Sequence, residues 1–380
     1  MPTPALPPPI SYDDAWIGGI IPGVLTAEGT LPQTTGQHAP GWLPAPALEA
    51  TTIVLFVLDG LGWTQLQANP TSAPNLAGME GLAISSAFPS TTATGLTSIT
   101  TGAPPSQHGI TGYAMRVGGK VMSALQWRYV GGGGKAPHPD TVQTQPVFGG
   151  HRVPVVTKAD FKRTGFSQAH LGDGEFHGWQ TPAVMVEQLR ALVRQQPPLV
   201  YTYYDGIDKV AHAHGLDNPI YRAELAETDR LVGLVRDALP PDAALLVTAD
   251  HGQVDIPSEH MRTLDGVKRM VTAYSGEGRA RGLFARAGAF KDLHDACIEQ
   301  YGDVAWVMTR EEVFEGGWFG PGASPTVRSR CGDVMLIARE PVAFLAPNFP
   351  MEAELRTMHG SLTPDEVLVP LLATRGTAAA

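Results

Sequence analysis

The chain has 380 residues, of which 43% are hydrophobic and 17% charged, and its formal net charge at pH 7 is −10. A chain of this size buries a large core and forms one large domain with an insertion, or two domains. The acidic surplus argues against a stable complex with nucleic acid, because such binding uses surplus Lys and Arg to neutralise phosphates. Two cysteines, Cys297 and Cys331, are too few for a disulfide framework.

The first part of the chain is rich in proline and weakly periodic, and we expect residues 1–50 to form an extended arm around the core. The opening MPTPALPPPISYDD has no basic segment followed by an apolar core, so it does not resemble a secretory signal. The sequence also has no apolar run near the length of about 20 residues that spans a bilayer. These features predict a cytoplasmic protein that does not enter a membrane.

Short apolar runs alternate with helical patterns in the rest of the chain. The run TIVLFVL at residues 52–58 is rich in β-branched residues and is typical of a buried parallel strand. Further apolar runs lie at residues 81–88, 199–204, 243–248, 333–338 and 367–373, and helical patterns lie at residues 181–195 and 221–239. This alternation predicts a doubly wound α/β sheet. We expect residues 51–254 and 358–380 to form that core, and residues 255–357 to form an inserted cap.

Three of the apolar runs are followed by acidic residues or histidines. These residues are Asp59 after the first run, Asp208 and His212 after the run at 199–204, and Asp250 with His251 after the run at 243–248. Because ligands bind at the carboxyl ends of strands in open α/β sheets, we expect these side chains to converge. Asp208 and His212 are four residues apart, so on a helix they share a face and can hold one ion. Carboxylates and imidazoles together favour Zn²⁺, whereas an all-oxygen set favours Mg²⁺ or Ca²⁺.

A late histidine and a hydroxyl-rich segment extend this set. His359 lies in MHGSLTPDE near the end of the chain. The segment AFPSTTATGLTSITTG, residues 87–102, places many hydroxyls where a helix is expected to begin. Taken alone, it is consistent with an ordinary Ser/Thr-capped helix that has a polar face. Together with the predicted metal ligands, it indicates a nucleophile at a helix N-terminus, where free amides favour a phosphate group.

The order of these motifs resembles the alkaline phosphatase superfamily, and most closely its nucleotide pyrophosphatase/phosphodiesterase branch. The resemblance is carried by Asp59, FPSTTATGLTSITTG with PPSQHGI behind it, DKVAH, VTADHG and MHGSLTPDE, from residue 53 to about residue 372. It implies an alkaline phosphatase-like fold, with a mostly parallel central sheet flanked by helices and a smaller cap. It also implies a phosphoric ester hydrolase with two Zn²⁺ ions, for which Mn²⁺ or Mg²⁺ can substitute.

The resemblance assigns roles to individual residues. The nucleophile of this branch stands ten residues before the glycine of a T-G-x-x-P-x-x-H-G-I stretch, which is Thr92 here, with Thr91 and Ser90 as the alternatives. One zinc would be held by Asp59, Asp250, His251 and the Thr92 oxygen, and the other by Asp208, His212 and His359. Attack by Thr92 on phosphorus would give a phosphothreonine, which water activated at the second zinc would hydrolyse. His214 and His260 are not expected to be ligands.

Two departures from the branch leave the substrate open. Residues 93–95 are Ala-Thr-Gly where the branch has Phe-Pro-Asn, and residues 111–113 lack the asparagine that contacts the phosphoryl oxygen. Tyr113 either replaces that contact or packs in the interior. The cation that a dianionic monoester needs could come from a charged segment containing Lys158, Lys162 and Arg163.

The expected substrate is therefore a small phosphate ester, with nucleotides among the candidates. A phosphodiesterase or pyrophosphatase is favoured, and a phosphomonoesterase using the same site is the alternative. A non-catalytic metal-binding relative is the least favoured class, because every presumed ligand position holds a competent residue.

Overall fold

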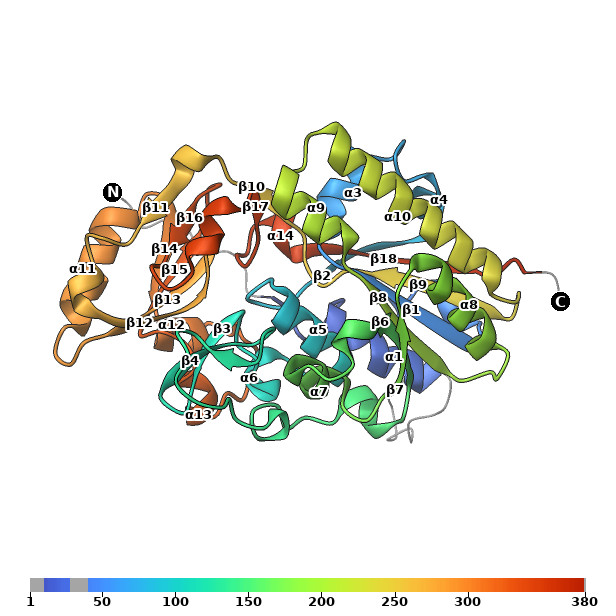
Figure 1. Cartoon of the computed structure of the whole chain (residues 1–380), viewed down its shortest axis with the longest axis horizontal. Coiled ribbons are helices and arrows are strands. Elements are labelled where there is room, and N and C mark those ends of the chain that lie inside the picture. Colours follow the sequence, from blue (N-terminus) through green and yellow to red (C-terminus); the bar gives the residue numbers. More distant parts are fainter. Residues whose placement is uncertain (1–9, 28–39, 379–380) are drawn as a thin grey trace.

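A seven-stranded sheet forms the centre of the computed structural model, which describes residues 10–27 and 40–378. The strand order is β2-β18-β9-β1-β8-β6-β7 (Figure 1). The bounds are β1 Thr52–Leu58, β2 Glu80–Ser85, β6 Pro154–Lys158, β7 Glu175–Trp179, β8 Leu199–Tyr204, β9 Ala243–Thr248 and β18 Leu368–Arg375. Strand β18 runs antiparallel to both of its neighbours, whereas the other pairings in this sheet are parallel. This is the doubly wound, mostly parallel sheet that the sequence predicts.

Helices cover both faces of this sheet. Figure 1 shows α3, α9 and α10 above it and α1, α5 and α7 below it. Their bounds are α1 Ile20–Ala27, α3 Trp63–Ala68, α5 Thr92–Thr101, α7 Gly165–Leu171, α8 Pro182–Val193, α9 Gly206–His214 and α10 Pro219–Ala238. The longest of them, α10, begins at a cap in which Asn218 accepts hydrogen bonds from the N–H groups of Ile220 and Tyr221. None of the helices in the described residues is long and apolar enough to cross a lipid bilayer.

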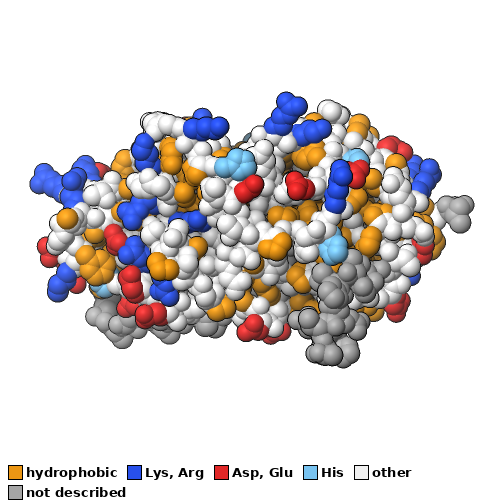
Figure 2. Space-filling view, turned by 90° about the horizontal axis from the view of Figure 1, so that it is seen from below, with side chains coloured by type: hydrophobic (Ala, Val, Ile, Leu, Met, Phe, Trp, Pro, Cys, Tyr) orange, Lys and Arg blue, Asp and Glu red, His pale blue; other side chains and the backbone are white. Residues whose placement is uncertain are grey.

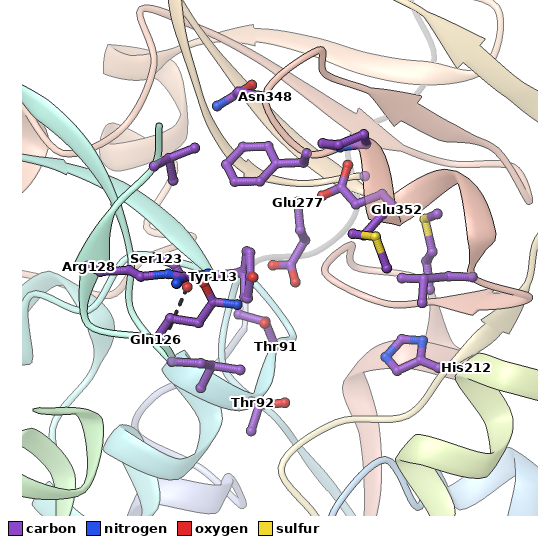
Figure 3. A pocket seen from close by; sticks show the side chains of 18 of the residues that line it. Thr91, Thr92, Tyr113, Ser123, Gln126, Arg128, His212, Glu277, Asn348 and Glu352 are labelled. Atoms are coloured by element: carbon purple, nitrogen blue, oxygen red, sulfur yellow. Dashed lines mark hydrogen bonds between the residues drawn. The ribbon is translucent and has the colours of Figure 1, made fainter. Parts of the chain in front are cut away.

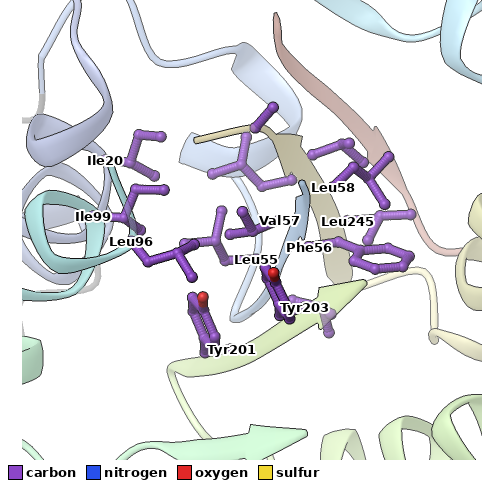
Figure 4. Close-up of a cluster of buried hydrophobic side chains, with 14 of the residues drawn as sticks. Ile20, Leu55, Phe56, Val57, Leu58, Leu96, Ile99, Tyr201, Tyr203 and Leu245 are labelled. Atoms are coloured by element: carbon purple, nitrogen blue, oxygen red, sulfur yellow. The ribbon is translucent and has the colours of Figure 1, made fainter. Parts of the chain in front are cut away.

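The core lies on both sides of the central strands. Every residue of β1 and β9 is buried. Successive side chains of a strand point to opposite faces, and Figure 4 shows Leu55 and Val57 on the side of α1 and α5, with Phe56 on the other side. A strand covered on both faces is apolar at every position, which explains the continuous run at residues 52–58.

The described part of the N-terminal segment contains short helices. The arm predicted for residues 1–50 falls partly on residues 1–9 and 28–39, which lie outside the described residues. In the remainder, Ile17–Gly19 form a 3-10 turn that leads into α1, and α2 spans Ala45–Leu48. The expected extended conformation is therefore wrong for these residues, although they pack on the core as expected. Pro22 is tolerated because it lies in the first turn of α1, where no intrahelical N–H bond is lost.

A second, antiparallel sheet lies within residues 255–357. Its order is β12-β13-β15-β14, with bounds Val271–Glu277, Ala280–Ala285, Val334–Ala338 and Ala305–Thr309. The associated helices are α11 Phe290–Tyr301, α12 Arg310–Glu315 and α13 Pro325–Arg328. This sheet has its own buried cluster around Leu283, Val334 and Phe344. The apolar run at residues 333–338 thus belongs to the second sheet.

Smaller elements connect the two sheets. Strands β3 Ala114–Val117, β4 Lys120–Ser123 and β5 Arg128–Tyr129 form a three-stranded sheet, and β10 Val254–Asp255 pairs with β17 Thr357–Met358. Strand β11 Met261–Thr263 pairs with β16 Ala343–Leu345. On the face shown in Figure 2, Lys and Arg side chains are interspersed with Asp and Glu. This face therefore has charges of both signs.

A buried ion pair joins the second sheet to the central one. Arg279 lies between β12 and β13, and Glu366 lies on α14, Pro364–Val367, just before β18. The Nη2 atom of Arg279 is 2.6 Å from Oε2 of Glu366, and its Nε atom is 3.0 Å from Oε1. Both side chains are fully buried. A bidentate pair of this kind fixes the relative position of the two elements.

Replacing Arg279 with alanine should leave the Glu366 carboxylate buried and unpaired. We expect the free energy of unfolding to fall by about 3–5 kcal/mol, the usual cost of removing one partner from a buried ion pair. Urea unfolding measures this change. Lys291→Ala is the matched control, because its ion pair with Asp295 is exposed and should have no measurable effect. Equal effects of the two substitutions would contradict the role given to Arg279.

Candidate active site

The predicted ligand residues meet at the carboxyl edge of the central sheet. Strands β1, β8 and β9 are adjacent and parallel, so their carboxyl ends lie side by side. Asp59 directly follows β1, and Asp250 with His251 follows β9 shortly after its last residue. Asp208 and His212 lie on α9, which begins just after β8. His359 follows β17.

These six side chains form two adjacent groups. One contains Asp59, Asp250 and His251 and the other Asp208, His212 and His359, and within each group the potential ligand atoms lie within 4.8 Å of one another. In the first group, Nε2 of His251 lies 3.4 Å from Oδ1 of Asp59. In the second, Nε2 of His212 lies 3.3 Å from Oδ1 of Asp208. The rings of His251 and His359 stack with their centroids 3.7 Å apart, which joins the two groups.

The histidines are oriented by backbone carbonyls. Nδ1 of His212 lies 2.7 Å from the carbonyl oxygen of Thr357. Nδ1 of His359 lies 2.9 Å from the carbonyl oxygen of Ser90, and Nδ1 of His251 lies 3.1 Å from that of Gly252. A carbonyl only accepts, so each Nδ1 carries a proton, and the neutral form of each ring has its free lone pair on Nε2. Burial, followed by the neighbouring histidines, lowers the pKa of His359 well below its usual value. Neutral imidazoles held in this way are suited to bind a metal ion.

The carboxylates lack partners that a cation would supply. Burial, followed by the charges of Asp250 and Asp208, raises the pKa of Asp59 well above its ordinary value. Burial likewise raises the pKa of Asp250 and of Asp208. Within the described residues, Oδ1 of Asp59 and Oδ2 of Asp250 accept no hydrogen bond. Because an unpaired buried acceptor is costly, these atoms fit a site that holds a metal ion.

Thr92 is the first residue of α5 and faces the first group. Its Oγ1 atom lies 3.1 Å from Nε2 of His251. The hydroxyls of Ser90, Thr94, Thr97, Thr100 and Thr101 instead donate to backbone carbonyls. Thr91 precedes α5 in an extended conformation. Figure 3 shows Thr91 and Thr92 together in the wall of a cavity, with His212 across from Thr92.

The stretch after α5 has a supporting role. Nε2 of His108 lies 3.0 Å from the Ser98 hydroxyl, and its Nδ1 accepts a hydrogen bond from the N–H of Ile110. Burial lowers the pKa of His108 to about 3, so the ring is neutral. His108 therefore fixes the position of α5 through Ser98. The T-G-x-x-P-x-x-H-G-I stretch thus supports the helix that begins with Thr92.

Three side chains not identified in the sequence also reach the two groups. The Tyr203 hydroxyl donates to Oδ2 of Asp59, and Nε2 of Gln253 donates to Oδ1 of Asp208 at 3.1 Å. Glu277 arrives from the second sheet and places Oε2 3.8 Å from Nδ1 of His359. Tyr203 and Gln253 lie within a few residues of predicted ligands, so their position in the sequence could have identified them as neighbours of the site. Glu277 lies far from every predicted ligand in the sequence and could not have been identified in this way.

Several other candidates have different environments. Lys158 is the last residue of β6, so it does not lie in the charged segment as a loop residue. Its side chain forms an ion pair with Asp205. Lys162 and Arg163 are exposed. His214 and His260 belong to neither ligand group. Tyr113 both lines the cavity and packs against Phe349, with ring centroids 6.1 Å apart.

Two cavities meet at Thr92. The larger has a volume of about 640 Å³ and lies between the β3-β4-β5 sheet and the second sheet, lined in part by Tyr113, Glu277 and Phe349. The smaller has a volume of about 290 Å³ and is lined by Phe166, Tyr201 and Lys209 among others. Thr92 and Asp208 line both cavities. A group bound at Thr92 can therefore extend in two directions.

Comparisons with known proteins identify the family and the fold of the chain. The model of the type I phosphodiesterase/nucleotide pyrophosphatase family matches residues 53–362, and the chain belongs to this family. Its fold is similar to that of murine ectonucleotide pyrophosphatase/phosphodiesterase 5, with a TM-score of 0.68 and 16% identity over 86% of this chain and 88% of that one. The human counterpart gives a TM-score of 0.67 and 17% identity over 84% and 87%.

An inactive threonine-to-alanine variant of the murine protein, in complex with AMP, matches with a TM-score of 0.67 and 16% identity over 84% of this chain and 87% of that one. No curated protein sequence matches the chain. The fold is thus that of the alkaline phosphatase superfamily, as the sequence predicts.

Replacing Asp59 with asparagine should change stability in opposite directions with and without metal. Since the folded-state pKa of Asp59 is raised, the folded protein binds more protons than the unfolded chain, and the metal-free protein loses stability as pH rises from the ordinary Asp value of 3.8 toward that raised pKa. At pH 8 the metal-free variant should therefore melt at a higher temperature than metal-free wild type. Added metal should stabilise wild type more than the variant.

Thermal melts after chelation and after metal addition measure both effects. Asp217→Asn serves as the control, because the Asp217 side chain is exposed and should leave both melts unchanged. A variant that is less stable than wild type in the metal-free state would show that Asp59 does not belong to an uncompensated acidic cluster.

Proposed function

We propose that the protein is a two-zinc phosphodiesterase or nucleotide pyrophosphatase that acts through a phosphothreonine on Thr92. The observation that carries this proposal is the position of the Thr92 hydroxyl, 3.1 Å from Nε2 of His251 and beside two groups of metal-ligating side chains. Membership of the type I phosphodiesterase family supports the reaction class. The loss of activity in the murine threonine-to-alanine variant supports a threonine nucleophile.

The side chains of both groups favour zinc. Each group combines carboxylate oxygen with imidazole nitrogen, a donor set that suits Zn²⁺ better than Mg²⁺. Asp59, Asp250 and His251 would hold one ion together with the Thr92 oxygen, and Asp208, His212 and His359 would hold the other. Two such ions would neutralise these carboxylates and would supply stabilisation of charge on the attacking and leaving oxygens. Mn²⁺ and Mg²⁺ are the substitutes to test.

The chain itself positions the reacting groups. The backbone N–H groups in the first turn of α5 have no intrahelical partners, so they can bind a phosphoryl oxygen beside Thr92. The Thr92 oxygen gives up its proton and attacks phosphorus, while the bond from phosphorus to the leaving alcohol breaks and that alcohol takes up a proton. Water then attacks the phosphothreonine, and the Thr92 hydroxyl is restored. The backbone donors contact the phosphoryl group throughout.

The surroundings of Thr92 favour a diester over a monoester. A diester has two organic substituents, and the cavities on either side of Thr92 offer one space for each. Lys158 and Lys209 both form their ion pairs with Asp205, so neither side chain is directed at the phosphoryl position. The murine relative's complex with AMP makes a nucleotide a reasonable candidate for one substituent.

Thr92→Ala should retain zinc and lose hydrolysis of bis(p-nitrophenyl) phosphate by a factor of about a thousand or more, because it removes the attacking oxygen. Thr91→Ala is the matched control, since it removes the neighbouring hydroxyl and should keep most of the turnover. Metal content by mass spectrometry and initial rates are the measurements. Loss of turnover in Thr91→Ala alone would reassign the nucleophile. Zinc-loaded wild type that hydrolyses neither this diester nor p-nitrophenyl phosphate would indicate a non-catalytic relative.

A further inference from the structure

Glu277 is a buried acidic residue that the mechanism above does not use. It is the last residue of β12, and its carboxyl group points into the larger cavity toward Thr91 and Thr92 (Figure 3). The residue is 8% exposed, and within the described residues its Oε1 atom has no hydrogen-bond partner. The Thr91 hydroxyl is a nearby donor to this carboxyl. Glu277 therefore lies beside the place where a phosphoryl group attacked by Thr92 must sit.

The backbone next to His359 holds the Glu277 side chain in place. Gly360, the residue after His359, has a φ of +125°, and a Cβ there would lie 2.9 Å from Cγ of Glu277. The loop thus packs directly on the Glu277 side chain, and any other residue at position 360 would push that side chain away. Together with the 3.8 Å approach to His359, this contact places the carboxyl group against the second ligand group.

The cations near Glu277 are committed to other partners. Arg281 forms an ion pair with Glu352 and donates to the Phe344 carbonyl oxygen. Arg128 supplies the one Lys or Arg side chain among the described residues that line the larger cavity. It is exposed and donates to Oε1 of Gln126 at 2.7 Å. The carboxyl of Glu277 thus faces the substrate space without a dedicated counter-charge.

We propose that Glu277 determines the preference for phosphodiesters over phosphomonoesters, an inference that rests on the proposed hydrolysis at Thr92. A monoester brings two negative charges to the phosphoryl site, and one of its charged oxygens must lie near Glu277. A diester carries a single negative charge and can place a neutral ester oxygen there. Repulsion between like charges a few ångströms apart at the surface of a cavity amounts to about a tenfold to hundredfold loss of monoester turnover.

The assay conditions favour the charged form of Glu277. Burial raises the pKa of this carboxyl, so the assays are run at an alkaline pH of about 9. A divalent cation in the neighbouring ligand group would favour the ionised form further.

Glu277→Gln keeps the shape of the side chain and removes its charge. With zinc-loaded enzyme at pH 9, we expect kcat/KM for p-nitrophenyl phosphate to rise about tenfold or more, while kcat/KM for bis(p-nitrophenyl) phosphate changes by less than about threefold. Glu277→Asp keeps the charge and should keep the preference for the diester. Glu354→Gln removes one charge at an exposed position of the same 3-10 helix that contains Glu352. It should leave the ratio of the two rates unchanged.

Three results would overturn this role. One is an unchanged ratio of diester to monoester turnover in Glu277→Gln, with zinc content and melting temperature equal to those of wild type. Another is an equal change of the ratio in Glu354→Gln, which would point to the overall charge of the protein. The third is a wild-type enzyme that prefers the monoester, which would leave hydrolysis at Thr92 intact. Hydrolysis of neither ester by wild type would instead refute the proposed function and the role of Glu277 together.

Discussion

The structure depends on one electrostatic constraint, the crowding of three carboxylates, two of them buried, at the carboxyl edge of the central sheet. Asp59 and Asp250 follow adjacent strands, and Asp208 lies in the first turn of α9, the helix that follows β8. Asp59 and Asp250 are buried and Asp208 is half-buried, and burial, followed by the charges of Asp250 and Asp208, raises the pKa of Asp59. Such a cluster is stable only where positive charge compensates it. Burial lowers the pKa of His251 and of His359, which favours their neutral forms, so bound cations are the compensating charge that fits this cluster.

The two sheets contribute different residues to the site. The central sheet and the helices that follow its strands supply five of the six residues that would hold metal and the helix that begins with Thr92, and His359 follows β17. The type I phosphodiesterase family model matches residues 53–362, which include all of these residues. The second sheet supplies Glu277 and part of the larger cavity wall, which includes Phe349. The Arg279–Glu366 ion pair joins these parts rigidly. We infer that the central sheet performs the chemistry, while the second sheet decides which ester reaches it.

The elements that the sequence predicts best are those buried on both faces. The runs at residues 52–58, 199–204 and 243–248 coincide with β1, β8 and β9, because such strands are apolar at nearly every position. Strands β6 and β7 lie toward the edge of the sheet and include polar residues such as Lys158 and His177, so no continuous run marks them. The prolines of the N-terminal segment, such as Pro22 and Pro46, masked the helical pattern of α1 and α2, so the sequence did not predict these helices.

The same contrast holds for the site. The ligand residues could be located because they follow strands directly, and the strand order then brings them together. Glu277 enters from a different sheet, about 70 residues along the chain from Asp208, and only the packing of the two sheets reveals it. Long-range packing of this kind leaves no local pattern in a single sequence.

A crystal structure of the zinc-loaded protein, with anomalous scattering recorded at the zinc edge, tests the central claim most directly. The account predicts two anomalous peaks, one among Asp59, Asp250 and His251 and one among Asp208, His212 and His359, separated by about 3.5–4 Å. A single peak, or peaks bound by other residues, would contradict it.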